Sequence, residues 1–330
     1  MATRNLKRVL RKTKDFGSIA AKVAMIKSTE KSYYVGNMNS VKRRNLLDVR
    51  SYSSYGLSSA GVKLGFPAQF VERYGTIHPE GAKKILTDLY SDATAKMMAE
   101  DNKRGTKRLF IRDFNGLHSA VLTDKYSVFD DDEVVDILKE NDYLMNSDEF
   151  WYSVSPERFH ARFISKNKLY IQDDPSPLSM CVFVDNSMCG MSSFRIRFGI
   201  YRWACTNGMI SGLKEFEIVR EAHKGEKEYV EIVAKALEDA PKYEQMLLDM
   251  VKDAATTKST IYDLDDYKAK AYLQKKLLIS GKAADTILTT FRTVYGGKSR
   301  WDLTNAITDY AHGVELETRL DLEAKALLVA

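Results

Sequence analysis

The sequence predicts an α+β fold, in which an antiparallel sheet carries helices on one face and is followed by a helical C-terminal region. Two observations predict this class. Runs with period-two alternation of apolar and polar residues fill the middle of the chain, as in half-buried strands. From about residue 226 onward, apolar residues recur at i, i+3 and i+4, as in amphipathic helices. Strands followed by helices indicate segregated elements rather than a parallel α/β sheet.

Composition divides the chain into three parts. Residues 1–66 form a basic arm and a linker rich in Ser, Gly and Tyr, residues 67–225 form the sheet core, and residues 226–330 form the helical region. No window holds the roughly 18 consecutive apolar residues that cross a bilayer, so we expect no membrane partner. The three cysteines lack C-x-x-C spacing, which favours a reducing, cytoplasmic setting and argues against a structural zinc site.

The N-terminal arm holds most of the excess positive charge. Residues 1–50 contain 13 Lys or Arg against 3 Asp or Glu, and such a segment attracts nucleic acid or an anionic membrane surface. Its apolar residues Leu6, Val9, Leu10 and Phe16 fall near one helical face, so a helix docked on its own domain is an alternative. A transit peptide is a third interpretation. The arm residues that we assign to nucleic-acid contact are Lys7, Arg8, Arg11 and Lys12.

The segments before the sheet core differ in pattern. Residues 51–66 show no sustained period and predict an ordered loop or linker. Residues 79–100 begin with Pro and carry apolar residues at helical spacing, which predicts a helix.

A hairpin and a helix start follow. Two β-rich runs flank Asn115-Gly116, the pair that best tolerates the positive φ angles of a type I′ turn. After the second run the period changes to about 3.6, and Asp130 with Glu133 has capping-box spacing. The sequence therefore predicts a strand that leads into a helix.

Three further strands complete the predicted sheet. Residues 157–172 suggest a second hairpin that turns near Asn167-Lys168, residues 180–186 a short strand, and residues 193–203 the longest strand. Alternation then assigns each side chain to one of two faces. The core positions are Phe159, Ala161, Phe163, Leu169, Ile171, Phe194, Ile196, Phe198 and Ile200. The opposite face carries Arg158, His160, Arg162, Lys168, Tyr170, Arg195, Arg197, Tyr201 and Trp203.

A sheet face that mixes cations with flat aromatic rings suits single-stranded nucleic acid. Cations meet the phosphates, while rings stack on unpaired bases at roughly 1 to 3 kcal/mol each. Two alternatives remain open at this point. The face is the ordinary solvated side of an antiparallel sheet, or the C-terminal helices cover it and their acids pair with the arginines.

Signals for catalysis are weaker. The acidic run at 130–133, with Asp136, Asp173 and Asp174, could ligate magnesium in a nuclease. Carboxylates in the first turn of a helix also satisfy free backbone amides, and the spacing suits that role better. The chain has no G-x-S-x-G, Walker or G-x-G-x-x-G pattern. We therefore assign no catalytic residue, metal or cofactor.

Three sequence blocks carry a family resemblance. They are AVLTDKYSVFDDDEVVDIL at 120–138, SFRIRFGIYRWACTNGMI at 193–210 and WDLTNAITDYAH at 301–312. In order and spacing they resemble the phage and plasmid family catalogued as domain of unknown function 932, over most of residues 105–315. The resemblance implies a phage or mobile-element origin and transfers no catalytic residue. The basic arm lies outside it.

Together these features favour a non-enzymatic nucleic-acid-binding protein. The leading hypothesis is single-stranded DNA binding or strand annealing in recombination or replication, by a homo-oligomer in the host cytoplasm. The alternatives are a metal-dependent nuclease that uses the acidic cluster at 130–136, and a virion or scaffold protein that touches packaged DNA.

Overall fold

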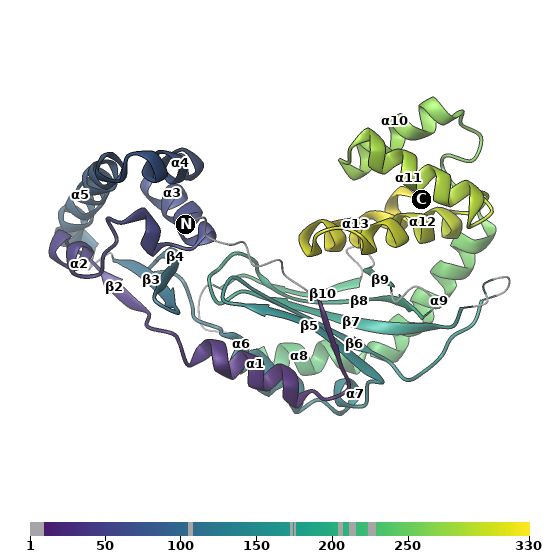
Figure 1. The fold of residues 1–330 in the computed structure, drawn as a ribbon. Coiled ribbons are helices and arrows are strands. Elements are labelled where there is room, and N and C mark those ends of the chain that lie inside the picture. The colour runs from purple at the N-terminus through teal and green to yellow at the C-terminus, as the bar shows by residue number, and fades with distance from the viewer. Residues whose placement is uncertain are drawn as a thin grey trace.

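The fold is a mixed helix and sheet structure with two antiparallel sheets, as the sequence predicts. A large sheet forms the base of the molecule, and two lobes rise from its ends on the same side (Figure 1). The computed structural model describes residues 10–104, 108–171, 174, 176–203, 207–210, 216–223 and 229–330.

The large sheet is antiparallel throughout and has the strand order β1-β5-β6-β7-β8-β10, with β9 also paired to β8. Strand β8 pairs with β7 on one side, and on the other side with β10 near its start and with β9 near its end. The strands are β1 Arg11–Thr13, β5 Glu149–Ser155, β6 Arg158–Ile164, β7 Leu178–Asn186, β8 Phe194–Arg202, β9 Asn207–Ile210 and β10 Glu217–Glu221.

One face of this sheet forms the main core. Phe194, Ile196, Phe198 and Ile200 are fully buried on it, which confirms the predicted alternation in β8. Burial of such side chains contributes roughly 1.5 to 3 kcal/mol each. The helices that pack around this face are α1 Gly17–Lys27, α6 Asp131–Lys139, α7 Asp142–Met145, α8 Tyr229–Glu238 and α9 Ala240–Thr256.

The N-terminal lobe contains the small sheet β2-β3-β4 and its own core. The predicted hairpin is confirmed, since Asn115 and Gly116 have φ angles of 54° and 76° between β3 and β4. The predicted helix at 79–100 is confirmed as α5. The elements of this lobe are β2 Tyr33–Val35, α2 Met38–Arg43, the 3-10 turn Val49–Ser51, α3 Ser54–Leu64, α4 Ala68–Ile77, α5 Pro79–Arg104, β3 Leu109–Phe114 and β4 Leu117–Thr123.

The predicted linker at 51–66 is wrong, because most of it is helix α3. Ser53 caps the helix by accepting the backbone N–H of Gly56 at 3.0 Å. Gly56 also lets α3 approach β4 closely, since a Cβ there would lie 1.8 Å from the carbonyl oxygen of His118. The small residues that resemble a linker therefore serve close helix–sheet packing.

The C-terminal lobe is a group of four helices with a separate core. Its last helix also reaches the large sheet, where Leu320 and Ala324 pack on the face opposite the main core. Within the described ranges, no helix is long and apolar enough to cross a membrane. The four helices are α10 Asp266–Leu277, α11 Gly281–Thr293, α12 Arg300–His312 and α13 Leu316–Val329.

Two other local predictions fail. β6 forms its hairpin with β5, so the turn lies between Ser155 and Arg158 rather than near Asn167-Lys168. Leu169 makes only an isolated bridge, to Leu178. The helical interpretation of the arm is wrong for residues 11–13, which form β1 against β5. Leu6 and Val9 lie outside the described residues.

Candidate nucleic-acid interface

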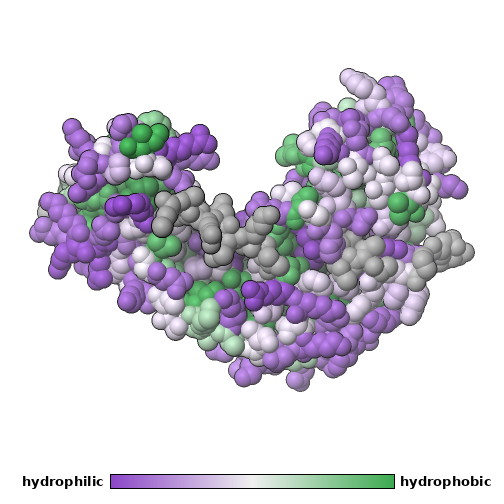
Figure 2. All heavy atoms as spheres, viewed as in Figure 1, coloured by the Kyte–Doolittle hydropathy of each residue, from purple (hydrophilic) through white to green (hydrophobic). Residues whose placement is uncertain are grey.

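The second face of the large sheet, called the polar face below, carries the side chains that alternate with the core positions. Strand register places Arg162 beside Phe183, and Phe183 beside Arg197, so the predicted division of faces holds across three strands. Helix α13 lies on this face, on the side of the sheet from which the two lobes rise (Figure 1). Figure 2 shows a hollow between the lobes. Its polar and aromatic members include Lys12, Trp151, Ser153, Arg158, His160, Arg162, Asp185, Arg195, Arg197 and Arg220.

Helix α13 covers the centre of the polar face. The Arg162 guanidinium donates to Glu323 at 2.7 Å, and the two side chains are 1% and 0% exposed. Glu323 also accepts the Nε–H of Arg319 at 2.8 Å. Arg162, which the sequence assigns to nucleic acid, is thus a structural ion-pair partner, as the covered-face alternative proposes. The charge of Glu323 can be buried because its carboxylate lies beside the guanidinium groups of both arginines.

A second ion-pair system lies beside the first. His160 Nδ1 is 2.7 Å from Asp185 Oδ1, and Arg197 pairs with the same carboxylate. His160 Nε2 accepts from Arg162 Nε at 3.1 Å, so the ring proton sits on Nδ1 and points to Asp185. Burial opposes ionisation of Asp185, but Arg197 and His160 outweigh it and hold its pKa well below the usual value. Burial lowers the pKa of His160, so His160 is a neutral, buried link rather than a surface cation.

The aromatic residues of β8 do not form an open platform. Tyr201 is 1% exposed and packs edge-on against Trp203, with ring centres 5.1 Å apart. Leu320 and Ala324 of α13 join this cluster. Trp203 is half-buried, and its indole N–H donates to Ser179 Oγ at 2.9 Å. The buried Tyr201 ring is thus not accessible to a base, whereas stacking on the half-buried Trp203 stays a prediction.

Lys168 and Tyr170 lie apart from the strands. The Lys168 ammonium lies over the Trp203 ring and 3.7 Å from Asp148. Tyr170 is 67% exposed and lies outside any strand. Both remain accessible at the end of the sheet near the C-terminal lobe, but the predicted hairpin that would align them with β6 does not form.

Four arginines remain accessible at the other end of the polar face, and we call them the arginine strip. Their side chains are 14% to 61% exposed. They come from three strands, and their ion-pair partners in the described part of the chain include the carboxylates of Glu317, Asp185 and Glu217. The arginine strip consists of Arg158 on β6, Arg195 and Arg197 on β8, and Arg220 on β10.

Arg220 is the member that the sequence analysis missed. It alternates with Val219, which is buried in the core, so period two in residues 217–221 could have revealed it. Asp185 and Glu323 were also missed, because no local signal links them to arginines on other elements.

The basic arm is only partly described. Lys7 and Arg8 lie outside the described residues. Arg11 is exposed on β1. Lys12 extends over the polar face, where its ammonium lies 2.5 Å from Glu149 and 5.9 Å from the centre of the Trp151 ring.

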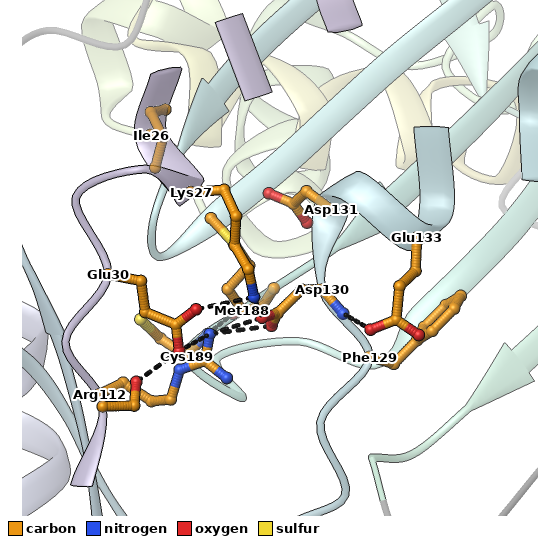
Figure 3. A network of polar contacts seen from close by, with 12 residues as sticks. Ile26, Lys27, Glu30, Arg112, Phe129, Asp130, Asp131, Glu133, Met188 and Cys189 are labelled. Atoms are coloured by element: carbon orange, nitrogen blue, oxygen red, sulfur yellow. Dashed lines mark hydrogen bonds and ion pairs between the residues drawn. The ribbon is translucent and has the colours of Figure 1, made fainter. Parts of the chain in front are cut away.

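The acidic run at 130–133 is engaged in structural contacts. Arg112 Nη2 lies 2.8 Å from Asp130 Oδ2, and both side chains are fully buried. Lys27 forms an ion pair with the same carboxylate, and the Glu30 carboxylate lies 3.0 Å from Arg112. Four charged side chains therefore meet here, from the end of α1, from β3 and from the start of α6 (Figure 3). The Glu133 carboxylate accepts the backbone N–H of Asp130, which confirms the capping-box spacing.

Two other carboxylates proposed for metal binding, Asp131 and Asp174, also make structural contacts, whereas Asp136 is exposed. Asp131 is fully buried and accepts a hydrogen bond from Asn186 at 2.9 Å. Asp174 accepts from Arg202 and from the Trp301 indole, and Asp173 lies outside the described residues. Among the residues that the structure does describe, no three His, Cys, Asp or Glu side chains are grouped as a metal site.

Comparison with known proteins identifies the family. No curated protein and no solved structure matches the chain. The family model described as Domain of unknown function (DUF932) matches residues 118–326, which is more than half of the chain. The match runs from β4 to near the end of α13, so it covers most of the large sheet and the C-terminal lobe but not the arm. The chain therefore belongs to the family of the domain of unknown function DUF932.

Proposed function

We propose that this protein binds single-stranded nucleic acid, DNA in preference to RNA, along the arginine strip at the base of the hollow between the lobes. The observation that carries the proposal is that Arg158, Arg195, Arg197 and Arg220 lie on one face of the large sheet, on three of its strands, with side chains 14% to 61% exposed. Guanidinium groups match phosphate oxygens in geometry as well as charge.

The paired acids do not prevent such binding. Glu317 is 39% exposed, so its ion pair with Arg158 is screened by solvent and weak. Glu217 lies 3.9 Å from Arg195, which is too long for a hydrogen bond. The Arg197–Asp185 pair is only 14% and 16% exposed, so a ligand displaces this carboxylate least easily. A nucleic acid that displaces these carboxylates replaces each arginine–carboxylate pair with an arginine–phosphate pair. It also releases the counterions condensed on its own backbone, which favours binding. Because Tyr201 is buried and the Lys168 ammonium lies over the half-buried Trp203 ring, we expect phosphate contacts rather than stacking to supply most of the affinity.

The test is fluorescence anisotropy with single-stranded DNA, duplex DNA and single-stranded RNA over a salt series. We expect Arg195→Ala and Arg220→Ala each to weaken binding and to reduce the slope of log K against log salt by about 0.7. Lys268→Ala, at an exposed position on α10, is the matched control and should behave like the parent protein. Undetectable binding at low salt, or equal losses in all three variants, contradicts the proposal.

We extend the proposal to strand annealing by several copies of the chain in the cytoplasm of a phage-infected or plasmid-bearing host. Tyr267 and Leu278 support self-association, since these apolar side chains on and after α10 are 83% and 81% exposed. Light scattering with and without DNA measures the assembly, and a strictly monomeric DNA complex would argue against it.

A further inference from the structure

A cavity of about 360 Å³ opens where the small sheet meets the large one. Its walls come from the end of α3, the end of β4 with the loop after it, the turn between β7 and β8, the start of β8 and the end of β10. This volume lies in the range of small-molecule sites. The lining residues used below are Lys63, Lys125, Tyr126, Ser192, Arg195 and His223.

The charge of this cavity has one sign. Lys63, Lys125 and Arg195 contribute three cationic groups from three separate segments, whereas no described lining residue is acidic. Lys63 and Lys125 are exposed, and neither makes an ion pair with another residue in the described part of the chain. Glu217, the partner of Arg195, is 3.9 Å away, which leaves that guanidinium free to contact a second anion.

His223 is buried in the wall of this cavity. The residue is 6% exposed and both ring nitrogens are buried. The backbone of Ser192 lies beside the ring but not in the geometry of a full hydrogen bond, and no other described residue pairs with either nitrogen. The Ser192 hydroxyl in the same wall is also buried without a partner. Native proteins rarely leave such groups unsatisfied, because each carries a desolvation penalty. Burial lowers the pKa of His223, so the ring is neutral and presents one N–H donor at neutral pH.

The wall around these donors is fixed. The Tyr126 ring stacks on His223 with centres 5.4 Å apart, and its hydroxyl donates to the carbonyl oxygens of Ser187 and Met188 at 3.2 and 3.1 Å. Gly190 has a φ of 68°, and a Cβ there would lie 3.0 Å from the Tyr126 ring. The turn thus closes over the tyrosine only because this position is glycine.

We propose that this cavity binds a phosphate monoester, with the three cations neutralising it and the His223 and Ser192 side chains donating hydrogen bonds to its oxygens. The volume leaves room for a nucleoside beside the phosphate. Two sources share this chemistry, namely a free mononucleotide and the 5′-phosphorylated end of a strand. The inference stands apart from nucleic-acid binding along the arginine strip, because only Arg195 belongs to both sites.

Titration calorimetry of the full chain with inorganic phosphate, with dAMP, and with a short oligonucleotide carrying either a 5′-phosphate or a 5′-hydroxyl tests the proposal. We expect phosphate and dAMP to bind, and the double variant Lys63→Ala/Lys125→Ala to bind each at least about tenfold more weakly, as for the loss of charge-assisted contacts. Lys282→Ala, an exposed lysine on α11, is the control and should bind both as the parent does.

The oligonucleotide arms separate the two sources. Tighter binding of the 5′-phosphorylated strand, lost in the double variant, assigns the site to a strand end, whereas binding of dAMP with no preference between oligonucleotides assigns it to free nucleotides. His223→Gln and Ser192→Ala should weaken either ligand while Arg220→Ala leaves it unchanged. The proposal is overturned if no phosphate compound binds, or if the double variant binds as well as the Lys282→Ala control.

Discussion

The adjacent carboxylates of Asp130 and Asp131 differ in their partners and therefore in the cost of their burial. Both are fully buried. Asp130 forms ion pairs with Arg112 and Lys27, whereas Asp131 accepts a hydrogen bond from the neutral amide of Asn186. Burial raises the pKa of Asp131 well above its usual value. The sequence predicts that both belong to the start of a helix, but the ion pair depends on residues about 20 and 100 positions away, which no local pattern reveals.

Substitution of these two residues should have opposite effects. Asp130→Asn leaves two cations without their buried partner, so we expect the free energy of unfolding to fall by about 3 to 5 kcal/mol. Asp131→Asn keeps an acceptor for Asn186 and removes an ionisable group from the core, so stability should be unchanged or higher at neutral pH. Urea denaturation of both variants at pH 7 measures the difference, and comparable losses in both would refute this assignment.

The pH dependence of Asp131→Asn follows from the raised pKa. Above about pH 4 the unfolded chain ionises Asp131 while the folded chain retains its proton, so this residue makes the parent protein less stable as pH rises towards the folded pKa. We therefore expect the stability of Asp131→Asn relative to the parent to increase from pH 4 to pH 7, by at most about 1.4 kcal/mol per pH unit. A difference that stays constant with pH would show that Asp131 is ionised in the folded protein.

At the scale of elements, local signals predict structure where the chain itself supplies the cause. The Asn115-Gly116 turn, the Asp130–Glu133 helix start and the alternation in β8 are confirmed because each depends on residues within one segment. Helix α3 was missed because its Ser and Gly residues resemble a loop, and only contact with β4 explains them. The pairing of β6 with β5 was missed because the connection between Ser155 and Arg158 lacks an Asn-Gly signature.

Gly56 tests the docking of α3 on β4. In Gly56→Ala the new Cβ would clash with the His118 carbonyl oxygen, so the helix must move away from the sheet, at a cost of about 1 to 3 kcal/mol or more. Ser58→Ala, at an exposed position on the same helix, should change stability by less than about 0.5 kcal/mol. Thermal denaturation of the two variants is sufficient, and equal stability would mean that α3 does not rest on β4.

At the scale of the whole molecule, α13 decides which part of the polar face a ligand can reach. Its acids lie more than 150 positions from the arginines that they meet on β6. The sequence shows that arginines line this face, but it gives no way to choose between an open face and a covered one. Each alternative holds for one part of the face: α13 covers the centre, and the arginine strip remains accessible.

Glu317→Ala should therefore strengthen nucleic-acid binding. It removes the carboxylate that competes for Arg158 at the edge of the hollow, so we expect higher affinity and a salt slope that increases by about 0.7, for one added phosphate contact. Because both side chains are a third or more exposed, stability should change by less than about 1 kcal/mol. Anisotropy of Glu317→Ala alone and combined with Arg158→Ala checks this, since the gain should disappear in the combination.

Strand β1 has a further consequence for the behaviour of the protein in concentrated solution. It pairs with β5 through Arg11, Lys12 and Thr13, and so occupies one edge of the large sheet. An uncovered edge strand offers a row of unpaired N–H and C=O groups to any neighbouring chain, and lysine or arginine at an edge opposes such pairing by repulsion. We therefore expect the cations of this strand to oppose edge-to-edge aggregation of the sheet. In a chain that began after Thr13, β5 would become the edge strand and lack these cations.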